Sequence, residues 1–309
     1  MALVSIRSAD HEACQALTAT WIPDVGADKM TTDEAARRRV KDMDTAISPT
    51  ISEADLGGWE RFVHWEQVWG TVVTFDVRGA DLGDGVADVV EQAVAFLHEV
   101  DGWFSTYRAD TPITAIRNGL LSEARSPRIV RDVLAACRVA RDLTEGLFDP
   151  WAVAGGVDPS GYVKGWAADV AAELLVSRGL ANVSVNAAGD VSCRGFQAPG
   201  TPWVIGIRHP DHADQVVRTV EVLDGAIATS GRYERGNHIL DPRRGVPGVV
   251  LESATVIGPD GGLADALATA LCIAGPDGIS FFQNLPGWSG YLIGDGRASF
   301  FGPAFDVRV

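Results

Sequence analysis

Three segments of the chain combine residue types that could act on a phosphate group. In the first, residues 155–166, several glycines and Asp158 precede or open a predicted helix that carries Lys164. Glycines let backbone N–H groups approach phosphate oxygens, a helix N-terminus adds partial positive charge, and the lysine adds a full charge. The segment predicts a diphosphate-binding loop. The alternative is an ordinary turn before a helix with a solvated lysine.

The second segment, residues 264–270, is an apolar helix pattern with a single charged residue, Asp265. Thr269 follows four residues later and would lie on the same helical face. A carboxylate and a hydroxyl at this spacing can offer two hard oxygen ligands to Mg²⁺, whose other positions go to water, a backbone carbonyl and substrate phosphate. The alternative is that Asp265 caps the helix and Thr269 bonds a backbone carbonyl.

The third segment, residues 228–242, contains hydroxyl residues and a histidine. A turn that brings Thr229, Ser230 and His238 together could supply hydrogen bonds to a substrate and a base with a pKa near neutrality. A loop histidine bonded only to backbone is the alternative. Of the six histidines in the chain, His238 is the one that we choose as a candidate base.

The elements that must position these residues can be predicted from periodicity. Alternation over 70–78 indicates a strand, and apolar residues at helical spacing over 86–100 indicate a helix. We expect a second helix that is capped by Ser126, has Pro127 at its first position and ends at Gly146. A third helix should run from near Lys164 to Gly179. Short strands and one more helix complete the pattern: 182–186, 204–208, 217–223, 226–229, 253–257, helix 263–274 and a hairpin at 294–296. Strict β-α-β alternation is missing, which predicts an α+β fold.

Composition limits the class of protein. The 309 residues are 46% hydrophobic, enough for a substantial core, and the net charge of -15 opposes binding to nucleic acid or to anionic membranes. No apolar run approaches the roughly 20 residues of a membrane span, and the N-terminus lacks a signal-peptide pattern. The four cysteines are widely spaced and are predicted to be reduced. We therefore expect a cytoplasmic protein without membrane insertion.

The N-terminal part differs from the rest of the chain. Residues 1–58 are polar, with one helix candidate that starts at the capping pattern of Thr31 and Glu34. We predict that they form a variable extension, and that residues 59–309 form the main domain.

Eight short motifs occur in an order that resembles the ApbE-type flavin transferases, also called FAD:protein FMN transferases. The similarity runs from about Val68 to Ile273. The motifs are residues 69–71, 104–108, 146–150, 158–165, 186–190, 229–231, 238–242 and 265–269. The resemblance implies an α+β domain related to the tunnelling fold, and an FAD-binding catalytic domain over residues 59–309.

The resemblance also implies roles for individual residues. FAD, as substrate, would contact Trp69, Tyr107, Leu147, Phe148, Asp149, Asp158, Lys164, Ser230 and Ile239. Mg²⁺, with Mn²⁺ as the alternative metal, would be held by the backbone carbonyl of Gly161 and by the side chains of Asp265 and Thr269. His238 would be the base, and Lys164 would offset charge on the pyrophosphate. The chain departs from the family pattern at Trp69, Trp151 and Ala188, which replace methionine, threonine and glycine.

The activity implied is magnesium-dependent cleavage of the FAD pyrophosphate, transfer of FMN to a Thr or Ser hydroxyl of an acceptor flavoprotein, and release of AMP. The acceptor would carry a Ser/Thr-Gly-Ala-Ser/Thr-like target segment, a pattern that this chain lacks. Two alternatives remain: an FAD pyrophosphatase that uses water and releases FMN and AMP, and a non-catalytic flavin-binding protein.

Overall fold

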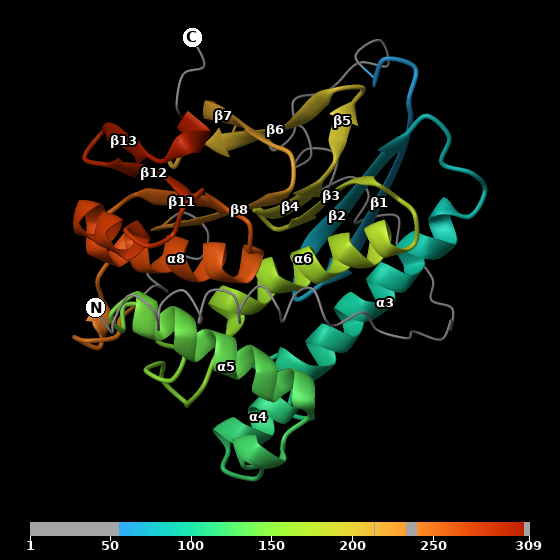
Figure 1. The fold of residues 1–309 in the computed structure, drawn as a ribbon. Coiled ribbons are helices and arrows are strands. Elements are labelled where there is room, and N and C mark those ends of the chain that lie inside the picture. Colours follow the sequence, from blue (N-terminus) through green and yellow to red (C-terminus); the bar gives the residue numbers. More distant parts are fainter. Residues whose placement is uncertain (1–55, 213, 233–239, 306–309) are drawn as a thin grey trace.

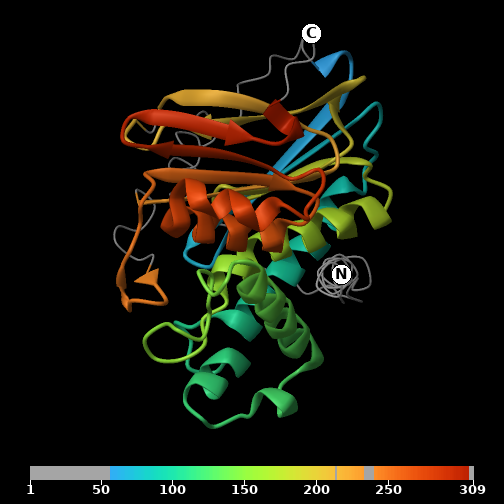
Figure 2. The ribbon, with the colours of Figure 1, turned by 60° about the vertical axis from the view of Figure 1, so that its left-hand side comes forward.

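The structure is a computed structural model that describes residues 56–212, 214–232 and 240–305. Its centre is an eight-stranded antiparallel sheet with the strand order β1-β2-β3-β4-β8-β11-β12-β13. Helices cover one face of this sheet, and a three-stranded sheet, β5-β6-β7, lies over the other face (Figures 1 and 2). This mixture of antiparallel strands and helices confirms the predicted α+β class.

The main sheet is built from β1 (Glu60–Val68), β2 (Thr71–Gly79), β3 (Asn182–Ala187), β4 (Asp190–Arg194), β8 (Gly225–Gly231), β11 (Ser253–Gly258), β12 (Ser289–Gly294) and β13 (Arg297–Phe301). The smaller pairings use β5 (Phe196–Ala198), β6 (Thr201–Arg208), β7 (Val216–Val222), β9 (Leu240–Asp241) and β10 (Val246–Pro247). The helices are α3 (Val86–Phe104), α4 (Pro112–Arg117), η2 (Glu123–Arg125), α5 (Arg128–Leu143), α6 (Ser160–Ser177), α8 (Gly261–Ala274), η3 (Gly275–Phe282) and η4 (Pro303–Phe305).

Most predicted elements are present, but β1, β4, β5 and α4 were not among the predicted ones. Strand β1 was not predicted, because its residues are partly exposed on both faces and give no clear apolar alternation. The proposed cap at Ser126 is wrong: α5 starts after Pro127, and the Ser126 hydroxyl donates to the Glu123 carbonyl. Helix α6 starts at Ser160, so Lys164 lies one turn inside it.

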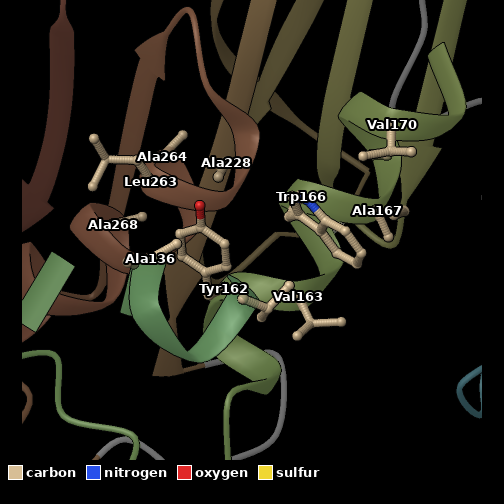
Figure 3. Packing of buried hydrophobic residues seen from close by; sticks show 14 of the residues in the cluster. Ala136, Tyr162, Val163, Trp166, Ala167, Val170, Ala228, Leu263, Ala264 and Ala268 are labelled. Atoms are coloured by element: carbon tan, nitrogen blue, oxygen red, sulfur yellow. The ribbon is translucent and has the colours of Figure 1, made fainter. Parts of the chain in front are cut away.

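The core lies between the sheet and the helix pair α6 and α8 (Figure 3). Tyr162 and Trp166 of α6 are buried beside Leu263 and Ala264 of α8. Small residues let these helices approach closely: a Cβ added at Gly262 would lie 2.6 Å from Tyr162 Cζ. The two helices that carry Lys164, Asp265 and Thr269 are thus packed directly on each other.

The closest point of this contact is between two backbones. A Cβ added at Gly165 would lie only 2.0 Å from the carbonyl oxygen of Gly261. No side chain fits there, so the glycine is required by helix packing.

We expect Gly165→Ala to destabilise the protein by about 1–3 kcal/mol or more, because the added methyl must push α6 away from α8. Urea denaturation measures the change. Gly102→Ala in α3 is the control, since a Cβ at that helical position meets nothing within 4 Å. Equal stability of the two variants would contradict the backbone contact.

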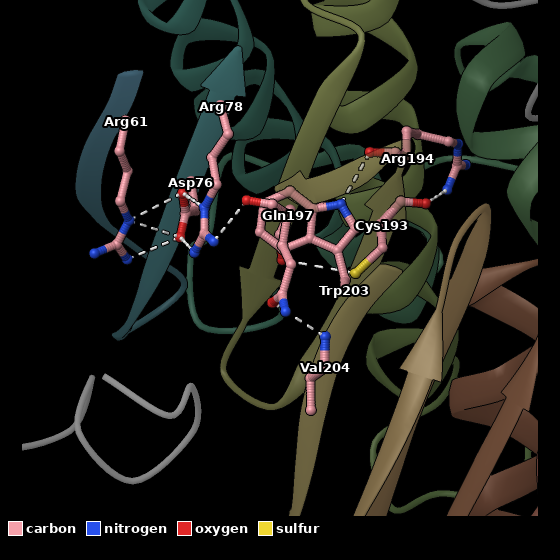
Figure 4. A network of polar contacts seen from close by, with 9 residues as sticks. Arg61, Asp76, Arg78, Cys193, Arg194, Gln197, Trp203 and Val204 are labelled. Atoms are coloured by element: carbon pink, nitrogen blue, oxygen red, sulfur yellow. Dashed lines mark hydrogen bonds and ion pairs between the residues drawn. The ribbon is translucent and has the colours of Figure 1, made fainter. Parts of the chain in front are cut away.

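The opposite face of the sheet holds a buried ion-pair network (Figure 4). Arg78 is 2% exposed and binds Asp76 through Nε and Nη2, at 2.9 and 2.6 Å, while its Nη1 donates to the Gln197 carbonyl. Arg61 binds the same carboxylate, and the ring of Trp203 lies 4.7 Å from the Arg78 guanidinium carbon. Strands β1, β2, β5 and β6 are joined by this network, whose charges are paired.

Three of the cysteines lie in the described part of the chain. Cys137, Cys193 and Cys272 are buried, and burial raises the pKa of the Cys193 thiol to about 12. Cys14, the helix candidate at Thr31 and the rest of residues 1–55 lie outside the described residues. Among the described helices, none combines the length and the apolar character needed to cross a bilayer.

Two carboxylates are buried where α8 begins. Asp260 is the N-cap of α8, and its Oδ1 accepts from the Leu263 N–H at 2.7 Å. Asp169 of α6 accepts from the Gly261 N–H and from the Ser192 hydroxyl, and lies 3.3 Å from Arg194. Burial, and then the charge of Asp169, raise the pKa of Asp260 from 3.8 to about 7.

This raised pKa predicts that stability depends on pH. Between about pH 4 and pH 7 the folded state keeps the Asp260 proton that the unfolded chain has lost, so stability falls as pH rises through this window. Asp260→Asn keeps an acceptor for the cap without the titration. We expect the variant to be more stable than the parent at pH 8, in urea denaturation at pH 5 and pH 8. Parallel pH curves for both proteins would contradict the assignment.

Candidate functional site

The candidate site lies where α6, α8 and the end of β8 meet. Asp265 is 3% exposed, in the second turn of α8, and Thr269 follows one turn later. The cap of this helix is Asp260, so the alternative in which Asp265 caps the helix is wrong. Asp265 is a buried carboxylate inside an apolar helix, where a partner of positive charge is needed.

One such partner is Lys164, which extends from α6. Its ammonium lies 3.7 Å from Asp265 Oδ2 and 2.6 Å from Oδ2 of Asp190, the first residue of β4. The Asp190 and Asp265 side chains are 3% and 4% exposed, and that of Lys164 is 20% exposed. Two buried carboxylates of the site thus contact one ammonium that still reaches solvent.

Hydroxyl groups converge beside this charge cluster. Ser230 Oγ lies 3.1 Å from Thr269 Oγ1, and a Cβ added at Gly161 would lie 3.6 Å from the same threonine oxygen. Gly161 has non-helical dihedral angles, with φ -80° and ψ 17°, in the first turn of α6. The three residues that the sequence linked to metal and substrate oxygens, Gly161, Ser230 and Thr269, are therefore neighbours.

The expected turn around Thr229 and Ser230 is instead a strand. Both residues belong to β8, where neighbouring side chains point to opposite faces. Thr229 Oγ1 contacts Thr255 Oγ1 at 2.9 Å, while Ser230 faces α8. Thr229 is thus separated from the site, and the prediction that groups it with Ser230 is wrong. His238 and Ile239 lie outside the described residues.

Asp158 stands just before α6, at the end of a closed loop. Its Oδ1 accepts from the Ser160 N–H at 3.1 Å, and its own N–H donates to the Pro150 carbonyl at 2.9 Å. Arg117 of α4 donates to the Val157 carbonyl and lies 4.0 Å from the Asp158 carboxylate. The loop 150–158 is thus fixed at its base and against α4.

The other predicted flavin contacts differ in how far they are buried. Leu147 and Phe148 are buried, and the Phe148 ring would lie 3.4 Å from a Cβ on Gly161. Asp149 accepts from the Trp151 N–H, Trp69 occupies the β1–β2 turn with φ 58°, and Tyr107 is 89% exposed. Among the described residues, the buried indole N–H of Trp69 has no hydrogen-bond partner.

The oxygen atoms of the site fit Mg²⁺ better than a softer metal. No cluster of three or more His, Cys, Asp or Glu side chains suited to a metal occurs in the described part of the chain. The proposed ligands, namely the Asp265 carboxylate, the Thr269 hydroxyl and the Gly161 carbonyl, do not form a cluster of that type. This set of oxygen atoms suits Mg²⁺, which is usually bound by one or two carboxylates together with water and substrate phosphates.

Comparison with known proteins shows which family the chain resembles. Residues 153–292 match the model of the ApbE family. The resemblance predicted from the eight motifs is confirmed.

Relatives named FAD:protein FMN transferase give the same result. The protein from Rhodobacter capsulatus is 34% identical over 214 residues, which are 65% of this chain and 38% of the relative. The protein from Escherichia coli K12 is 33% identical over 162 residues, which are 48% of this chain and 46% of the relative. The chain thus spans less than half the length of these curated relatives in the matched regions.

Solved structures share the fold. The flavin transferase ApbE from Vibrio cholerae superposes with a TM-score of 0.68 at 23% identity, covering 80% of this chain and 98% of that one. The apo form of the Pseudomonas stutzeri flavinyl transferase ApbE gives a TM-score of 0.68 at 21% identity, covering 80% and 96%. These likenesses confirm the predicted ApbE-like α+β architecture.

Two features of the site were missed by the sequence predictions. Asp190 was noted only as part of a motif, although a carboxylate directly after a tight turn could have been considered as a partner for Lys164. Gly165 was treated as part of a phosphate loop, whereas the structure shows that it makes room for α8. Neither contact leaves a signal in local periodicity, because each joins residues distant in the chain.

Proposed function

We propose that this protein is a magnesium-dependent FAD:protein FMN transferase, which cleaves the FAD pyrophosphate, attaches FMN through a phosphoester to a Thr or Ser of an acceptor protein, and releases AMP. The observation that carries the proposal is the convergence of Lys164, Asp265 and Thr269 at the contact of α6 and α8. An ammonium beside a buried carboxylate and a hydroxyl is a suitable environment for a metal-bound diphosphate. The names of the relatives support this choice.

In this proposal Asp265, Thr269 and the Gly161 carbonyl hold Mg²⁺, and Mn²⁺ is a possible substitute. The ion would supply positive charge that offsets the charge developing on the phosphate oxygens. The buried carboxylate of Asp265 supports the assignment, since a cation beside it would compensate its charge.

The chain's own residues bind and orient FAD. Lys164 offsets charge on the pyrophosphate, and Ser230 donates a hydrogen bond to FAD. Asp158 contacts the nucleotide at the start of α6. The proposed flavin pocket is formed by Trp69, Tyr107, Leu147, Phe148, Asp149 and Ile239. The acceptor hydroxyl oxygen attacks the FMN phosphorus, and His238 removes the proton of that hydroxyl.

The test is incubation with FAD, Mg²⁺ and an acceptor that carries a Ser/Thr-Gly-Ala-Ser/Thr-like segment. We expect a fluorescent flavin band on the acceptor in a denaturing gel, with one AMP released per FMN attached. An acceptor with alanine in place of the target hydroxyl residue is the matched control. Release of free FMN and AMP without a labelled band would favour the pyrophosphatase, and no AMP release would favour a flavin-binding protein.

Three further proposals concern the whole chain. Residues 59–309 form the catalytic domain and residues 1–58 a variable extension. Limited proteolysis followed by the transfer assay tests this division. The partner is a separate acceptor flavoprotein, and neither nucleic acid nor membrane insertion is involved. The cytoplasmic location expected from the sequence stays a prediction, which cell fractionation tests.

A further inference from the structure

Asp190 has no part in the function proposed above, yet it lies closer to Lys164 than Asp265 does. The distance from Lys164 Nζ is 2.6 Å to Asp190 Oδ2 and 3.7 Å to Asp265 Oδ2. The ammonium therefore lies nearer to Asp190 on β4 than to Asp265 on α8.

The backbone around Asp190 fixes its position. The residue pairs with Ala187 across a two-residue turn formed by Ala188 and Gly189, which have φ angles of 58° and 105°. Asn186 Oδ1 accepts from the Gly189 N–H at 2.9 Å and closes the turn. Asp190 is 2% exposed and has only a short side chain, whereas Lys164 has a long and flexible one. The carboxylate is therefore the fixed partner, and the lysine is the group that can move.

We propose that Asp190 is a positioning residue, which holds the Lys164 ammonium away from Asp265 and so keeps that carboxylate available for a divalent cation. The inference rests on the metal site of the proposed function. Attraction between opposite charges grows as their separation falls. Without the charge of Asp190, the ammonium would move towards Asp265, occupy its oxygen and repel the cation.

A double-mutant cycle on metal binding tests this inference. Mn²⁺ is titrated without FAD, and free Mn²⁺ is read by electron paramagnetic resonance. We expect Asp190→Asn to weaken binding about tenfold. In the Lys164→Met background, the same substitution should change the affinity by no more than about twofold, because the competing ammonium is gone.

The cycle separates this role from two others. If Asp190 attracted the cation directly, or only supported the fold, Asp190→Asn would weaken Mn²⁺ binding equally with and without Lys164, and the inference would be overturned. Asp76→Asn is the matched control: this buried carboxylate binds Arg78 on the other face of the sheet, and its loss should leave Mn²⁺ affinity unchanged. Thermal unfolding of each variant shows that the fold is retained.

Activity assays distinguish this inference from the proposed function. With FAD, Asp190→Asn should raise the Mn²⁺ concentration for half-maximal AMP release about tenfold, with kcat at saturating Mn²⁺ changed much less. If the cycle shows coupling but FAD yields no AMP, the proposed function is wrong and the role of Asp190 stands. If FMN transfer is normal and the cycle shows no coupling, only the role of Asp190 is overturned. Absence of Mn²⁺ binding by the parent protein would overturn it as well.

Discussion

Asp265→Asn should lower the rate of AMP release from FAD by about 10³-fold, because it removes the only carboxylate of the proposed Mg²⁺ site and metal charge stabilisation is worth several kcal/mol. The fold should persist, since Lys164 keeps its 2.6 Å ion pair with Asp190. Turnover measured over a range of Mg²⁺ concentrations, together with calorimetric titration of Mg²⁺, checks the loss of rate and of metal binding, and thermal unfolding checks the fold.

The matched control for Asp265 is Asp277→Asn. Asp277 is an exposed acid in η3, directly after the helix that carries Asp265. This control should retain activity and metal affinity. Unchanged Mg²⁺ dependence in the Asp265 variant would remove the metal assignment, whatever its effect on rate.

His238→Ala should lower kcat by roughly 10²- to 10⁴-fold if His238 is the general base, with the affinity for FAD little changed. The reason is that a base acts on the acceptor hydroxyl and has no part in holding the nucleotide. Stopped-flow flavin fluorescence gives the affinity, and labelling of the acceptor gives the rate.

His212→Ala serves as its control, because His212 is an exposed histidine between β6 and β7. It should behave like the parent protein. If the His238 variant instead binds FAD poorly but transfers FMN at a normal rate when saturated, the residue is a binding group and the base must be sought elsewhere.

The sequence predicted most of the fold because the buried strands have strong apolar patterns. In β2, Val73, Phe75 and Val77 are fully buried and alternate with less apolar residues. Strand β1 has no such pattern, because it is an edge strand whose side chains are partly exposed on both faces. Edge strands depend on pairing with a neighbour, which local sequence does not record.

The candidate site was predicted in part, for a similar reason. The spacing of Asp265 and Thr269 was sufficient to place both on one face of a helix, which the structure confirms because both residues belong to α8. The contact between Lys164 and Asp190 spans 26 residues and two elements, and periodicity gives no access to it. Positions such as Gly165 have the same difficulty, since a glycine needed for helix contact looks like a glycine needed for a turn.

The backbone contact of Gly165 with Gly261 also limits how the protein can move. Packed helices usually slide past each other through small changes of side-chain rotamers, the motion known as shear. At this crossing there are no side chains to rearrange, and the Gly261 N–H is held by Asp169. We therefore expect α6 and α8 to behave as one rigid unit, so that any opening that admits a nucleotide must come from elements other than this helix pair.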